Sequence, residues 1–250
     1  MTDALVSEFD TVARWTEEVV ADLGPDYAIP ASCRGSASPG ALAWLAESLQ
    51  VPVGGRFLDA GAGLGGPAAW LAERYDLRTV LAEPMVGAAG GSHRLFGLPA
   101  VAAWSEHLPF GTASFDAAWA LGVLSTTAAQ FEVLCELRRV LRPAGRLGLL
   151  VFVAREQVPD APDGTRFPGD AELHHLLDRA GFWLAQTVDA PSLAGAPVAW
   201  TARMERVEEE LRARHGADPA WVQAQEQERR MGKVLESGQV RPRLVLATAV

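Results

Sequence analysis

The stretch "FLDAGAGLGG", residues 57–66, is the feature of this sequence that most limits how the chain folds. Four of its last six residues are glycine, and Asp59 stands just before them. Glycines permit a tight turn and a close approach of the backbone to a ligand, and the following helix offers free N–H groups. Because "RFLDA" has the apolar pattern of a buried strand, the stretch predicts the strand, glycine turn and helix of a nucleotide-binding α/β domain.

Strand and helix patterns alternate after this loop. Near-continuous apolar strands separated by helices predict a parallel sheet with helices on both faces. We therefore predict a doubly wound, Rossmann-like α/β fold with a seven-stranded, mostly parallel sheet and a helical lid. The expected strands are 56–60, 78–84, 100–104, 115–124, 145–154, 182–190 and 241–250, and the expected helices between them are 65–75, 87–96, 128–141, 170–181, 200–216 and 219–238.

The chain of 250 residues is expected to form one domain, residues 1–250. Helical spacing over 3–22 and 41–51 predicts an N-terminal helical cover, residues 1–50, while Gly, Pro and Ser between these helices predict a loop over 24–40. The ligand-binding core is then 51–190, the helical lid insertion is 191–239, and the last strand is 240–250.

Charge and composition exclude several classes of protein. A formal net charge of -9 argues against a nucleic-acid-binding surface, which needs clustered Lys and Arg. The two cysteines, Cys33 and Cys135, stand outside any CxxC spacing, so neither a disulfide framework nor a metal site is expected. The N-terminus lacks the pattern of a signal peptide, and the longest apolar runs have the length of a buried strand. We expect a cytoplasmic protein without membrane partner, as a monomer or homodimer.

Two ligands fit the glycine loop. The pattern Gly61-x-Gly63-x-x-Gly66 satisfies the dinucleotide fingerprint, and an acid, Glu83, follows about 20 residues on, where it could accept the ribose hydroxyls. Either NAD or another adenosine ligand could use this arrangement. Asp59 separates them, because a carboxylate at the tip of the strand attracts a sulfonium and an ammonium group and repels a pyrophosphate.

Further segments favour the adenosine ligand that carries a sulfonium and an ammonium group. The pattern hydrophobic-hydrophobic-Asp-x-Gly-x-Gly-x-Gly, the stretch "WSEHLPFGTASFDAAWALGVL" and the stretch "ELRRVLRPAGRLGLLVF" follow in this order after a helical preamble of more than fifty residues. Together, over roughly residues 55–185, they resemble the class I S-adenosylmethionine-dependent methyltransferases of the small-molecule type. The resemblance implies S-adenosyl-L-methionine as cofactor.

The resemblance also implies roles for individual residues. Asp59 would lie at the amino acid end of the cofactor, Glu83 would hold the ribose hydroxyls, and Met85 would lie against the adenine. The full set of implied cofactor-binding residues is Asp59, Ala60, Gly61, Ala62, Gly63, Glu83, Pro84, Met85, Trp104, Ser105, Glu106, Leu121 and Gly122. One position departs from the family pattern: Trp104 stands where the family often has an acid that bonds the adenine amine. An indole cannot accept that bond, which leaves Ser105 or a backbone carbonyl for the task.

The acceptor and its chemistry are less defined. The stretch "ALGVLSTT" after the fourth strand lacks the Asn/Asp-Pro-Pro-Tyr/Phe tetrapeptide of nucleic-acid and protein amide methylases, so the family resemblance favours a small, hydrophobic organic acceptor such as a secondary metabolite. No catalytic base is identified, and the candidates are Tyr27, His93 and His107.

Three alternatives remain. The first is an S-adenosylmethionine-binding protein of this fold without methyl transfer, and the second is an NAD(P)-dependent oxidoreductase, against which the missing Tyr-x-x-x-Lys pair argues. The third is a structural or partner-binding protein with an eroded site. The intact set of Asp59, Gly61, Gly63 and Glu83 argues against erosion.

Overall fold

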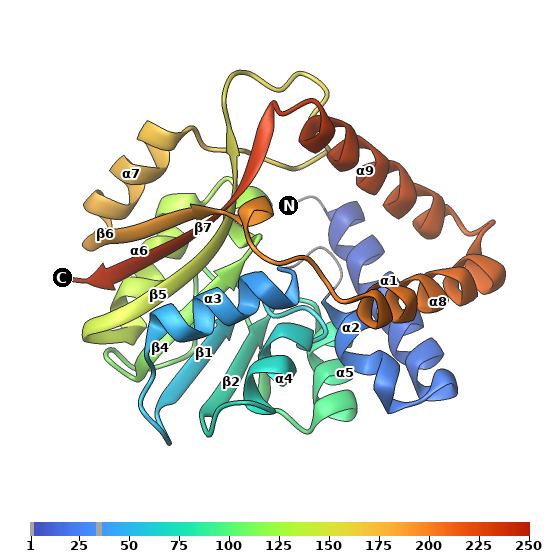
Figure 1. The fold of residues 1–250 in the computed structure, drawn as a ribbon, viewed down its shortest axis with the longest axis horizontal. Coiled ribbons are helices and arrows are strands. Elements are labelled where there is room, and N and C mark those ends of the chain that lie inside the picture. The colour runs from blue at the N-terminus through green and yellow to red at the C-terminus, as the bar shows by residue number, and fades with distance from the viewer. Residues whose placement is uncertain (1–2, 34–36) are drawn as a thin grey trace.

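A computed structural model describes residues 3–33 and 37–250 (Figure 1). Within these residues seven strands form one sheet in the order β3-β2-β1-β4-β5-β7-β6. β7 runs antiparallel to its two neighbours, β5 and β6, and the other pairs are parallel. This confirms the predicted doubly wound, mostly parallel sheet. The strands are β1 (Arg56–Ala60), β2 (Arg78–Glu83), β3 (Ala100–Ala102), β4 (Phe115–Leu121), β5 (Leu141–Ala154), β6 (Phe182–Asp189) and β7 (Val240–Ala249).

The helices lie close to their predicted positions, except at the N-terminal loop. Residues 24–40 were expected to form a loop, but Ala28–Ser32 form the short helix α2, because this segment is buried against its neighbours. Residues 34–36 of the same stretch lie outside the described residues. No helix in the described ranges combines the length and apolar character needed to cross a bilayer. The helices are α1 (Asp3–Leu23), α2 (Ala28–Ser32), α3 (Pro39–Leu49), α4 (Gly66–Ala72), α5 (Val86–Phe96), α6 (Gln130–Val140), α7 (Asp170–Arg179), α8 (Val198–His215) and α9 (Pro219–Glu236).

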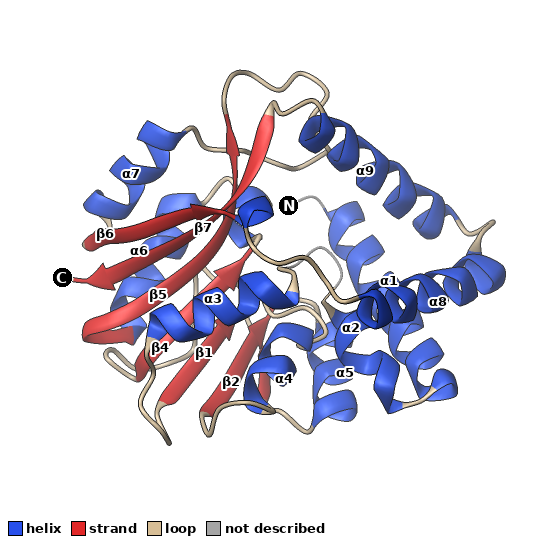
Figure 2. Ribbon diagram, viewed as in Figure 1, coloured by secondary structure: helices blue, strands red, loops and turns tan. Residues whose placement is uncertain are grey.

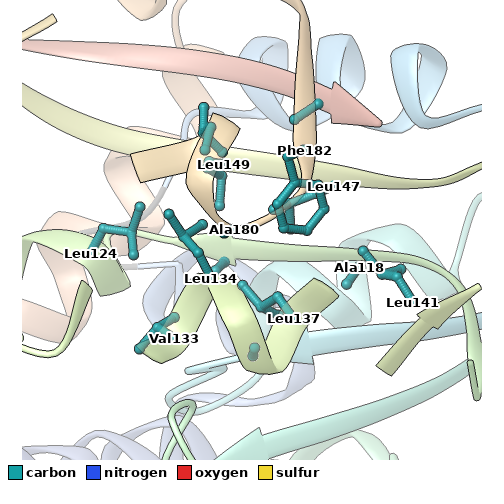
Figure 3. Close-up of a cluster of buried hydrophobic side chains, with 14 of the residues drawn as sticks. Ala118, Leu124, Val133, Leu134, Leu137, Leu141, Leu147, Leu149, Ala180 and Phe182 are labelled. Carbon is teal, nitrogen blue, oxygen red and sulfur yellow. The ribbon is translucent and has the colours of Figure 1, made fainter. Parts of the chain in front are cut away.

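Helices cover both faces of the sheet (Figure 2). Successive side chains of a strand point to opposite faces, so Phe57 packs with Trp119 on the side of α3 and α4, at a ring distance of 4.9 Å. Leu58 and Ala118 face the other side, where α6 and α7 complete the largest apolar cluster (Figure 3). This double coverage explains why the central strands β1 and β4 are buried over nearly their whole length.

A group of helices from both ends of the chain lies beside the sheet, at the right of Figure 1. It consists of α1, α2, α8 and α9, and its apolar centre includes Val20 of α1, Leu211 of α8 and Trp221 of α9. An ion pair of 2.7 Å between Arg214 and Asp22 also joins α8 to α1. The insertion between β6 and β7 is therefore packed onto the N-terminal helix rather than folded as a separate unit.

The same group touches the glycine loop through α2. A Cβ atom built on Gly66, the first residue of α4, would lie 2.5 Å from the carbonyl carbon of Ser32 and 2.7 Å from the amide nitrogen of Cys33. These are backbone atoms, so neither side can yield easily. Gly66 thus permits the contact between α2 and α4.

We predict that Gly66→Ala lowers the free energy of unfolding by about 1–3 kcal/mol, because the added methyl group overpacks this contact. Gly232→Ala is the matched control: it lies within α9 with no atom near its Cβ position. Alanine there should raise stability by up to about 1 kcal/mol through helix propensity. Urea unfolding of the three proteins measures both effects, and equal stability of Gly66→Ala and the unmodified chain would contradict the close packing.

Candidate functional site

The glycine loop leaves β1 and turns sharply toward α4. Gly61 and Gly63 have φ angles of 74° and 55°, values that L-residues with side chains rarely adopt. The N–H of Gly61 donates to the carbonyl of Ala82 at 2.8 Å, which holds the loop against β2. A side chain on Gly61 would collide with Val123, whereas no atom lies within 4 Å of a Cβ built on Gly63. The backbone at Gly63 is therefore open to a ligand.

Glu83 ends β2 and is tied to this loop. Its carboxylate accepts hydrogen bonds from the N–H of Gly63 at 2.7 Å and from the N–H of Met85 at 3.0 Å, and the residue is 2% exposed. Burial raises the pKa of Glu83, the two amides counteract this, and the charge of Asp10 adds to the rise. The side chain thus connects the loop after β1 to the loop after β2.

Asp59 lies one position before the end of β1 and is 1% exposed. Burial raises its pKa to about 7, the Trp119 indole opposes the rise, and the charge of Glu83 adds to it. Its Oδ2 atom has no hydrogen-bond partner. Burial and the Asp59 charge together raise the pKa of the Cys33 thiol. A buried carboxylate with an unpaired oxygen is costly, and a ligand with a positive charge would satisfy it.

The ends of β3 and β4 complete the same edge of the sheet. Gly122 follows β4 with a φ of 82° and donates its N–H to the carbonyl of Leu150 at 2.9 Å. Val123, the next residue, is the one that blocks a side chain on Gly61, so the two loops touch. After β3, Ser105 is buried, while the Trp104 side chain is 40% exposed.

The structure therefore places the predicted cofactor-binding residues together, because the carboxyl ends of parallel strands meet at one edge. That they bind a cofactor stays a prediction. Asp59, Ala60, Gly61, Ala62 and Gly63 come from β1 and its loop, Glu83, Pro84 and Met85 from the end of β2, Trp104, Ser105 and Glu106 from beyond β3, and Leu121 and Gly122 from the end of β4.

The three candidate bases are not brought together. His93 is exposed in the last turn of α5, with Nδ1 3.2 Å from the carbonyl oxygen of Leu98, just ahead of β3. It lies where the strands begin, at the edge opposite the glycine loop. Tyr27 packs into the group of α1, α2 and α8, and His107 is exposed in the turn after β3. Among the described residues no cluster of His, Cys, Asp and Glu could hold a metal ion.

Sequence reasoning missed the contribution of α1 to this edge. The Asp10 carboxylate accepts the N–H of Ala88 at 3.1 Å, at the start of α5, and Glu17 pairs with Arg94 near the other end of that helix. Asp10 and Glu17 are seven residues apart and share one face of α1. This spacing was the available signal, although it did not identify α5 as the partner.

Comparison with known proteins identifies the family of the chain. The family described as "Methyltransferase domain" matches residues 58–149. The uncharacterized methyltransferase YodH of Bacillus subtilis is 31% identical over 172 residues, which are 63% of this chain and 72% of YodH. The chain belongs to the class I S-adenosylmethionine-dependent methyltransferases. S-adenosylmethionine is the cofactor of this family.

Two other methyltransferases match shorter regions of the chain. Methyltransferase GfsG of Streptomyces halstedii is 35% identical over 127 residues, 46% of this chain and 44% of GfsG. The O-methyltransferase cnsE of Penicillium expansum is 31% identical over 157 residues, 54% of this chain and 55% of cnsE. The chain thus spans about half the length of these two proteins.

Several solved structures share the fold of this chain. The [4+2]-cyclase SpnF has a TM-score of 0.67 at 23% identity, over 83% of this chain and 80% of SpnF. A geranyl diphosphate methyltransferase in complex with SAM has a TM-score of 0.62 at 15% identity, over 84% of each chain. At these identities the likeness concerns the fold.

The raised pKa of Asp59 gives a prediction for the ligand-free protein. Between about pH 4 and pH 7 the folded protein keeps a proton on Asp59 that the unfolded chain releases. The free energy of unfolding should therefore fall as pH rises through this window, by roughly 1–4 kcal/mol in total. Asp59→Asn has no titrating group there and should lose this part of the slope.

The measurement is urea unfolding from pH 4 to pH 8, with the difference between the two proteins plotted against pH. Subtraction removes the titrating groups that both proteins share and that do not interact with Asp59. Parallel curves for the two proteins would show that Asp59 ionises at its ordinary pKa, and would remove the electrostatic argument for a cationic ligand.

Proposed function

We propose that this protein transfers a methyl group from S-adenosylmethionine to a small, hydrophobic organic acceptor. The observation that carries the proposal is the buried Asp59 carboxylate, whose Oδ2 lacks a partner. It lies at the base of a glycine loop with an open backbone at Gly63. A cationic ligand fits both features, because it can pair with the free carboxylate oxygen and approach the bare backbone at Gly63 closely, whereas a pyrophosphate would be repelled by Asp59 and Glu83.

The residues at this edge suit the parts of the cofactor. Asp59 would face the positively charged amino acid end, the backbone of Gly61 and Gly63 would approach the ligand closely, and Glu83 would accept the ribose hydroxyls. Glu83 now accepts the N–H groups of Gly63 and Met85, so its carboxylate has lone pairs left for hydroxyl donors. When bound, the cofactor supplies an activated methyl group.

The chain's own contribution is alignment and exclusion of water. Leu121 and Gly122, at the end of β4 beside the glycine loop, would lie by the sulfonium of the cofactor and help to align it with the acceptor. No base is required for the transfer unless the acceptor must lose a proton, as a hydroxyl does. Similarity to cnsE supports a hydroxyl acceptor, because that relative is an O-methyltransferase.

The domain division predicted above also remains a proposal. Residues 1–50 and 191–239 would cover the acceptor, with 51–190 holding the cofactor and 240–250 completing the sheet. Contacts around Asp163 support a covering role for α9. Arg230 of α9 bonds the Asp163 carboxylate at 2.8 Å, and Gln227 accepts the Asp163 N–H at 2.9 Å, which joins α9 to the long loop after β5.

A second candidate function is S-adenosylmethionine binding without methyl transfer, because the [4+2]-cyclase SpnF has this fold. Two experiments separate it from the first. Calorimetric titration with S-adenosylmethionine, S-adenosylhomocysteine and NAD identifies the cofactor, and transfer of labelled methyl groups to a panel of apolar hydroxylated compounds tests the reaction.

Binding of the two adenosyl ligands together with labelled product supports the methyltransferase. Binding with no product across the panel favours the second function. Binding of NAD alone would overturn both and restore the oxidoreductase.

We predict that Glu83→Gln weakens S-adenosylmethionine binding by about 10- to 100-fold, because hydrogen bonds to a charged acceptor contribute more than those to an amide. Glu73→Gln is the matched control, since Glu73 is exposed at the end of α4. Its dissociation constant should equal that of the unmodified protein. Titration calorimetry at pH 8 measures all three, and an unchanged constant for Glu83→Gln would remove Glu83 from the site.

A further inference from the structure

Trp104 and Met85 leave the sheet at the same corner. Glu83 of β2 pairs in register with Ala102 of β3, and the N–H of Ala103 donates to the carbonyl of Glu83 at 3.2 Å. Each side chain lies two positions beyond this pair, on neighbouring parallel strands. Met85 and Trp104 thus occupy equivalent positions after neighbouring strands, just beyond the residue proposed to hold the ribose.

Exposed apolar side chains gather around this corner. Trp104 is 40% exposed, and Val86, which begins α5 directly after Met85, is 72% exposed. Phe9 of α1 is 46% exposed, and its neighbour Asp10 bonds the N–H of Ala88 in the first turn of α5. Water-exposed apolar surface beside a buried polar anchor is the composition of a pocket for a flat ring with a polar substituent.

Position 104 carries an indole rather than a carboxylate. The Trp104 indole has one N–H donor and no acceptor, so it cannot bond an exocyclic amine, but its face can stack on a base. Ser105 is buried and Glu106 is half-buried, one and two positions further along the turn. The exposed side chain directly after β3, Trp104, therefore presents an aromatic ring.

We propose that Trp104 binds the base of the cofactor by stacking and that this chain does not read the 6-amino group of adenine. The inference rests on the proposed function, since it assumes that the ribose is held by Glu83. The base would be recognised through the area of its ring that stacks on Trp104, rather than through a hydrogen bond to its amine. The site would then accept purine cofactors that lack the amine.

The test compares two ligands by titration calorimetry: S-adenosylhomocysteine and its 6-deamino analogue, in which hydrogen replaces the amine. The analogue keeps the N1 acceptor and the ring area, so it reports on the amine alone. The unmodified protein should bind both with dissociation constants within about 3-fold of each other. Trp104→Ala should weaken both equally, by between about 5-fold and about 150-fold, the range of base–aromatic stacking.

Three variants make the test specific. Trp104→Phe keeps an aromatic face and should stay within about 5-fold of the unmodified protein for both ligands. Trp104→Asp introduces an acceptor and should bind the amine-bearing ligand at least about 10-fold more tightly than the analogue. Trp183→Ala is the matched control, because Trp183 is an exposed tryptophan on β6, at the other edge of the sheet, and both constants should be unchanged.

Two results would overturn the inference while leaving the proposed function intact. The unmodified protein could bind the 6-deamino analogue more than about 10-fold more weakly, which means that a group such as Ser105 or Glu106 reads the amine. Alternatively, Trp104→Ala could bind both ligands as tightly as the unmodified protein. Failure of the unmodified protein to bind S-adenosylhomocysteine is a separate result, which overturns the proposed cofactor and this inference together.

Discussion

The Glu83 carboxylate, shared between the amides of Gly63 and Met85, is the interaction on which the site depends. It fixes the loop after β1 relative to the loop after β2. It also places a second negative charge near Asp59, which adds to the rise in the pKa of that carboxyl. The edge of the sheet therefore carries two buried carboxylates, an arrangement that a cationic ligand with hydroxyl donors would stabilise.

Much of the core follows from sequence because its physical rules are local. The strand expected over residues 56–60 matches β1 residue for residue, since a short apolar run ends at a glycine turn. The meeting of four loops at one edge follows from parallel strands, whatever the details of the helices. The residue list itself came from the family resemblance, and the geometry then explains why such distant positions lie together.

The cover helices were harder to place, for equally physical reasons. Amphipathic spacing predicts that α1 buries a face, but it does not say against what. The Asp10 contact with the first turn of α5 joins segments 78 residues apart, and no local pattern encodes that distance. α2 likewise forms in a stretch with Pro30 and Ser32 because burial against α1, α4 and α8 outweighs the weak local preference. The residue type alone also could not decide whether a histidine belongs to the site. His93 is a chemically suitable base, but α5 runs away from the glycine loop and carries it to the opposite edge of the sheet.

The position of β7 has a consequence for the order in which the chain becomes structured. β7 is inserted between β5 and β6, yet it follows both in the sequence by more than fifty residues. As this chain emerges from the ribosome, β6 has no strand partner until residues 240–249 have been made, and the edge of β5 stays exposed for the same interval. Unpaired strand edges invite association with other chains, so the interval in which α8 and α9 are synthesised is the one in which the nascent protein is most open to aggregation.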